Sequence, residues 1–120
     1  MVETLKELPA NVVGFKATGQ ITKEDYDTVV FPMINEHIKS GKKLNYVFVV
    51  DTPLKNFSVG AWMMDAWLGL KELLNWHKVA IVSDDQKIQQ FTNTMGHLVP
   101  GDYKAFPVSN QQQAVSWAAA

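Results

Sequence analysis

Two amino acids are missing from this sequence, and their absence excludes several classes of site. The 120 residues include no cysteine, which excludes disulfides, thiol catalysis and cysteine-ligated metals. All 11 basic residues are lysine, and lysine lacks the planar donor fork with which arginine binds phosphate in a bidentate manner. The formal net charge of -1 provides no positive field for nucleic acid. We therefore expect no DNA or RNA partner.

The sequence also lacks the apolar segments that direct a chain into or across a membrane. The opening residues, MVETLKELP, are acidic and contain no basic segment followed by an apolar block, so we expect no secretory signal. The longest apolar stretch is interrupted by Asp65 and is shorter than the ~20 residues that span a bilayer. We expect a cytoplasmic protein, and leave open a peripheral contact with the inner membrane.

The apolar pattern that is present predicts a single α/β domain over residues 1–120. Residues 2–8 and 11–19 are typical of two short strands joined by a turn, which predicts an antiparallel hairpin. The nearly unbroken apolar segments Leu44–Asp51 and 79–82 are typical of strands buried on both faces of a parallel sheet. A further short strand is expected at residues 103–106.

Four helices are expected to alternate with these strands. The first begins after a Thr22 cap and is interrupted by Pro32, where we expect a kink. The second covers residues 58–76 after a Ser58 cap, and the third follows Asp85. The fourth is expected to begin at Ser109, in a capping box with Gln112. This order predicts a mostly parallel five-stranded sheet with one antiparallel edge strand and four helices.

The helix expected at residues 58–76 is apolar on more than one side. At ~100° per residue, one arc collects apolar side chains that we interpret as the core face. These are Val59, Met63, Ala66, Leu70, Leu73 and Leu74. Met64 and Leu68, with Ala61 beside them, fall on the opposite side, where we expect an exposed second stripe. This stripe could pack under a loop or helix, or contact a second copy, an apolar ligand or a membrane.

No pattern in the sequence predicts catalysis. The three histidines belong to different expected elements and have no metal-ligand spacing, and no serine lies in a GxSxG motif. Asp51, Asp84 and Asp85 follow strands, where a hard cation could bind, but we interpret them as helix caps and surface groups. We therefore expect a protein that is not an enzyme and that uses no metal and no cofactor.

Four segments of the sequence occur together in a known family. They are GFKATGQITKEDY before a proline-bearing helix, a strand that ends in Asp51, the segment FSVGAWMMDAWLGL, and AIVSDD at a strand end. Over nearly its whole length the sequence resembles the SpoIIAA-like family, small bacterial proteins with a STAS-like fold that are grouped with CRAL-TRIO-type lipid-binding domains. The resemblance implies a sheet surrounded by helices, and a role in carrying apolar molecules or associating with membranes.

The sequence departs from the anti-sigma-factor antagonists of the STAS class at their phosphorylation site. Those proteins carry a phosphorylatable serine directly after the third strand, whereas here Asp51 is followed by a longer loop before Ser58. Ser58 still precedes a helix, where the dipole and free amides favour phosphate. A plain N-cap is the simpler interpretation of this serine.

These observations predict that an apolar, lipid-like small molecule binds between the helix at 58–76 and the helix after Asp85. The residues expected to bind it are apolar side chains of these two helices and of the loop before the first. They are Phe57, Trp62, Met63, Met64, Trp67, Leu68, Phe91 and Met95. Two alternatives are a regulatory protein-interaction module, with Ser58 as a phosphosite, and a homodimer formed through the second stripe.

Overall fold

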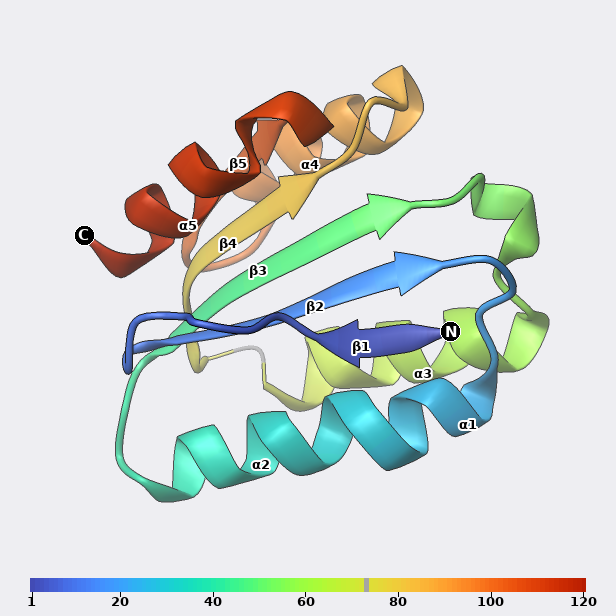
Figure 1. Ribbon diagram of the computed structural model, residues 1–120. Helices are drawn as coiled ribbons and strands as arrows, with labels where there is room; N and C mark the ends of the chain where they lie inside the picture. Colours follow the sequence, from blue (N-terminus) through green and yellow to red (C-terminus); the bar gives the residue numbers. More distant parts are fainter. Residues whose placement is uncertain (73) are drawn as a thin grey trace.

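The computed structural model describes residues 1–72 and 74–120, in which five strands form one sheet in their sequence order (Figure 1). The strands are β1 (Val2–Thr4), β2 (Val12–Thr18), β3 (Leu44–Asp51), β4 (Trp76–Val82) and β5 (Asp102–Phe106). β1 is antiparallel to β2, and every other neighbouring pair is parallel. The hairpin and the mostly parallel sheet expected from the sequence are therefore confirmed.

The first helical segment contains a change of helical register just before its proline. It consists of α1 (Lys23–Asp25), the π-helical η1 (Tyr26–Val30) and α2 (Phe31–Lys39), and the predicted Thr22–Asp25 capping box is present. The N–H of Phe31 donates to the Tyr26 carbonyl five residues earlier. Pro32 lies in the first turn of α2, directly after the π-helical turn, and has no N–H to donate to a carbonyl of that turn. The kink expected at this proline stays a prediction.

Three further helices follow the parallel strands. They are α3 (Val59–Lys71), α4 (Gln86–Leu98) and α5 (Gln111–Ala119), with short 3₁₀ turns at η2 (Leu54–Asn56) and η3 (Val108–Asn110). The Ser58 Oγ accepts from the Ala61 N–H at 3.0 Å, as a cap should. The predicted Ser109 cap is wrong, because η3 occupies this position and no side chain caps α5. The helix predicted at 58–76 is also shorter, since β4 already begins at Trp76.

The helices are divided unequally between the two faces of the sheet. Because the parallel strands run in sequence order and crossovers are right-handed, the helices between them all fall on one face. There they cover Tyr46 and Phe48, whereas α5 covers Val47 and Val49 on the other face. In Figure 1, α2 and α3 lie on the opposite side of the sheet from α5. The alternation of side chains along β3 thus supplies two separate cores.

α3 is turned the opposite way from the sequence prediction. Ala61 and Leu68 are buried, with Leu68 only 2% exposed, and Met64 is partly buried against the same core. The arc predicted to be core is exposed instead, as Val59, Met63, Leu70 and Leu74 show, and Ala66 is exposed with them. Leu73 lies outside the described residues.

Two polar side chains on the buried side of α3 explain why the prediction was wrong. Asp65 and Glu72 were expected on the solvent side of the helix because they are charged. The Asp65 carboxylate instead accepts a hydrogen bond from the Tyr26 hydroxyl. The Glu72 carboxylate accepts one from the Asn75 side chain at 2.9 Å. A buried polar group is tolerated when it is hydrogen-bonded. The apolar residues opposite them are therefore left facing outward.

A ligand-sized cavity between two helices

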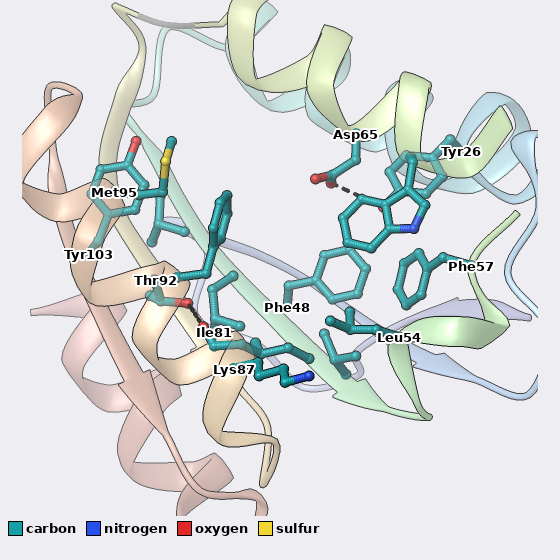
Figure 2. A pocket seen from close by; sticks show the side chains of 15 residues that line it. Tyr26, Phe48, Leu54, Phe57, Asp65, Ile81, Lys87, Thr92, Met95 and Tyr103 are labelled. Atoms are coloured by element: carbon teal, nitrogen blue, oxygen red, sulfur yellow. Dashed lines mark hydrogen bonds between the residues drawn. The ribbon is translucent and has the colours of Figure 1, made fainter. Parts of the chain in front are cut away.

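A cavity of about 420 Å³ lies between α3 and α4 (Figure 2). Its floor is formed by side chains of three adjacent parallel strands, Phe48 and Val50 of β3, Val79 and Ile81 of β4, and Tyr103 of β5. These residues all lie on the face of the sheet opposite α5. The floor is continuous because alternate residues on neighbouring strands point to the same face.

On either side of the cavity, α3 and α4 pack against different neighbours. At Gly60 of α3, an added Cβ would lie 3.1 Å from the Lys23 Cβ, so α3 is held tightly against the start of the first helical segment. At Gly96 of α4, an added Cβ would lie 3.5 Å from the Tyr103 Cβ of β5. Gly60 therefore permits a tight approach of α3 to that segment, whereas Gly96 lies at ordinary contact distance from β5. The space between the helices is left open.

The opening of the cavity is flanked by aromatic side chains from both helices. Trp62 of α3 is 45% exposed and Phe91 of α4 is 65% exposed, although both line the cavity. The Trp62 ring packs against Phe57, with ring centroids 5.4 Å apart. Large apolar side chains that are both exposed and part of a cavity wall mark an entrance that an apolar molecule can use.

A carboxyl group, that of Asp65, lies among the mostly apolar side chains that line the cavity. Asp65 projects from α3, and its Oδ1 accepts a hydrogen bond from the Tyr26 hydroxyl at 3.0 Å. Burial raises the pKa of Asp65 above its ordinary value, and the hydrogen bond from Tyr26 offsets part of this rise. Burial raises the pKa of Tyr26 and Tyr46 as well, with the nearby Asp65 charge adding to both shifts. This corner of the cavity therefore contains hydroxyl and carboxyl groups with little access to water.

Comparison with known families and structures agrees with the fold of the domain. The SpoIIAA-like family matches residues 12–119. The chain belongs to the SpoIIAA-like family. A similar solved structure is that of an uncharacterised protein from Shewanella loihica PV-4 with a SpoIIAA-like fold, which is 23% identical, with a TM-score of 0.76 over 98% of this chain and 93% of that chain. At this identity the likeness shows the fold alone, and no curated protein matches the sequence.

Half of the predicted ligand-binding residues line the cavity of this SpoIIAA-like domain. Those that do are Phe57, Trp62, Phe91 and Met95. Those that do not are Met63, Met64, Trp67 and Leu68. Of these four, Leu68 and Met64 face the core of the domain, and Met63 and Trp67 are exposed on its surface. The cavity lies between the two helices named in the prediction, and of the five predicted residues of α3 it is lined by Trp62. Ligand binding itself stays a prediction.

Several lining residues were missed by reasoning from the sequence. Tyr26, Phe48, Ile81 and Tyr103 were counted as core or left unassigned, because no pattern shows which part of a core face remains uncovered. Asp65 offered a usable signal, since it interrupts the most apolar helix of the chain. A charged residue in such a segment requires a partner or a function.

The outward side of α3 forms a second feature, which we call the outer face. It consists of Val59, Met63, Ala66, Trp67 and Leu70, all of which are exposed. It begins next to the cavity entrance, because Trp62 precedes Met63 on the same helix. Contiguous apolar surface of this kind is uncommon on a monomer and usually contacts something.

The other candidate residues have structural partners. Asp85 caps α4 through the Lys87 N–H at 2.8 Å, and Asp84 accepts from the Val108 N–H at 2.9 Å. Asp51 lies 3.9 Å from the Lys16 ammonium. Within the described residues, no three side chains of His, Asp or Glu gather as a metal site. In the same part of the chain, no helix has the length and apolarity needed to cross a membrane.

Proposed function

We propose that this domain binds and carries an apolar, lipid-like small molecule in the cavity between α3 and α4, without catalysing a reaction. The observation that carries the proposal is the cavity itself, about 420 Å³ in volume and lined almost entirely by aromatic and aliphatic side chains. Small-molecule sites in proteins have volumes of roughly 300–1,000 Å³. Transfer of apolar ligand surface from water would supply about 25 cal/mol per Å².

The outer face of α3 supports a route by which such a ligand reaches the cavity. Trp67 and Met63 offer apolar groups that can enter the interfacial region of a bilayer, where tryptophan is favoured. Lys55 before the helix and Lys71 at its end are exposed, and can approach acidic headgroups. The net charge of -1 makes this attraction weak. We therefore propose reversible contact with a membrane surface, with exchange of the ligand through the entrance beside Trp62.

The test separates the cavity from the outer face by two variants. Ile81→Phe enlarges a side chain of the cavity floor, so the affinity for the apolar dye Nile red should fall about tenfold, or about 1.4 kcal/mol. The matched control, Met63→Ser/Leu70→Ser, alters only the outer face. It should keep the dye affinity of the wild type and lose co-sedimentation with vesicles that contain acidic phospholipid. Dye titration and vesicle sedimentation measure the two effects independently.

The alternatives predict different results in the same experiment. Equal dye affinity of the wild type and Ile81→Phe would show that the cavity is not the binding site. Native mass spectrometry of the freshly purified protein reports retained ligand and subunit number together. A dimer that is lost in Met63→Ser/Leu70→Ser would assign the outer face to self-association. A cellular partner that depends on phosphate at Ser58 would favour the regulatory module.

A further inference from the structure

Asp65 is poorly compensated for a carboxylate that faces an apolar cavity. Its described hydrogen bond comes from the Tyr26 hydroxyl, at 3.0 Å. No ammonium group of the described residues lies within ion-pairing distance of its carboxylate. Placing an ionised carboxylate in an apolar environment is costly unless a cation or several donors pair with it.

The groups around Asp65 on the neighbouring elements do not supply the missing positive charge. Tyr26 of η1 donates to it, and Tyr46 of β3 has a buried hydroxyl that finds no partner among the described residues. Across the cavity, Tyr103 of β5 donates to the Pro100 carbonyl at 3.3 Å. Lys87 of α4 lines the far wall and is exposed, so its ammonium can remain in water.

Aromatic rings lie on the same side of the cavity as Asp65. In Figure 2, the rings of Phe48 and Phe57 lie on the side of the cavity where Asp65 projects from α3, and Tyr26 reaches the carboxylate from behind. The faces of such rings attract cations, most strongly where water is excluded. A carboxylate beside aromatic faces is an arrangement that suits an organic cation.

We propose that the ligand of this cavity is an amphiphile with a protonated amine, which pairs with Asp65 while its apolar body lies over the strand floor. The inference rests on the proposed function, because it names the class of molecule that the cavity takes. A fatty acid would place a second carboxylate beside Asp65, and the two charges would repel. A neutral alcohol could donate a hydrogen bond but would leave the negative charge of Asp65 uncompensated.

The test compares three ligands with the same decyl chain, decylamine, decanol and decanoate, as competitors of Nile red at pH 7. Because decylamine adds a positive charge to the hydrogen bond that decanol can also donate, it should bind about 10- to 100-fold more tightly than decanol. Decanoate should bind most weakly. Asp65→Asn keeps an oxygen that can accept from Tyr26, so the fold is maintained. In this variant, decylamine should bind no more tightly than decanol, whose affinity stays unchanged.

A pH titration provides a second readout, with decyltrimethylammonium as a probe whose charge does not change. Its affinity should fall as the pH is lowered, because a protonated Asp65 has no charge to pair with. Since burial raises the pKa of Asp65, the fall should begin at a higher pH than for a carboxyl with the ordinary value of 3.8. The affinity of Asp65→Asn for this probe should stay constant over the same titration.

The outcomes that would overturn the inference are distinct from failure of the proposed function. If decylamine and decanol bind equally in both the wild type and Asp65→Asn, the Asp65–Tyr26 pair is structural. If decanoate binds most tightly, Lys87 rather than Asp65 selects the ligand. If either of these results is obtained and Nile red still binds in the cavity, the proposal that the domain carries an apolar molecule is kept, and the proposal that the molecule is an amine is rejected. If neither the dye nor any decyl compound binds, both proposals fall.

Discussion

The two faces of the sheet differ in how completely helices cover them. On one face, Ala114 and Ala118 let α5 lie directly on the strands, where both are fully buried. On the other face, Gly60 lets α3 approach the first helical segment closely, whereas Gly96 of α4 lies at ordinary contact distance from Tyr103 of β5. Small residues thus let α5 cover one face completely. The other face contributes a core of its own and still leaves room for a ligand between α3 and α4.

The largest expected effect concerns which side of α3 belongs to the core. Leu68→Glu would bury a charge at a position that is 2% exposed, and should lower the free energy of unfolding by about 3–5 kcal/mol. The matched control is Leu70→Glu, on the same helix at a position that is 66% exposed. It should change the free energy of unfolding by less than about 0.5 kcal/mol. Urea unfolding of both variants measures the difference. Equal destabilisation would contradict the orientation of α3 described above.

This pair of variants also shows what the sequence could and could not predict. Strands, helix order and the caps at Thr22, Ser58 and Asp85 followed from local patterns, because alternation, capping oxygens and turn residues act over a few positions. The rotation of α3 did not follow, because both of its sides are apolar. It was decided by the distant hydroxyl of Tyr26, which accommodates Asp65 in the core.

The second expected effect compares added volume on the two faces. Ala114→Leu enlarges a fully buried residue beneath α5, and overpacking should lower the free energy of unfolding by about 1–3 kcal/mol. Ile81→Phe adds volume to the floor of a cavity, so we expect a change of less than about 1 kcal/mol, since the ring has space to occupy. Thermal and urea unfolding test both. If Ile81→Phe were the more damaging variant, the open face would be as tightly packed as the closed one.

The cavity could be predicted only in part for a related reason. Phe57 and Trp62 belong to the segment that is unusually apolar in the sequence, and Phe91 and Met95 lie at helical spacing in the helix after Asp85. Phe48 and Tyr103 have the same patterns as residues of a filled core. Whether helices meet above a strand depends on where each helix packs, and α3 packs against Lys23, which is distant in the sequence.

The smallest expected effect compares Ser58, which caps α3, with Ser109, which was predicted to cap a helix and does not. Ser58→Ala removes the oxygen that accepts from the Ala61 N–H at 3.0 Å, and should lower the free energy of unfolding by about 1 kcal/mol. Ser109→Ala should change the free energy of unfolding by less than about 0.5 kcal/mol. The reason is that η3 lies where a cap was expected, and the Ser109 hydroxyl donates to the neighbouring Asn110 side chain.

The same pair of serines separates stability from ligand binding. Ser58 lies at the start of α3 and does not line the cavity, so Ser58→Ala should bind Nile red as the wild type does once both are folded. Dye titration at a temperature well below the unfolding transition measures this. If Ser58→Ala lost dye binding while keeping its full stability, the start of α3 would take part in the site directly.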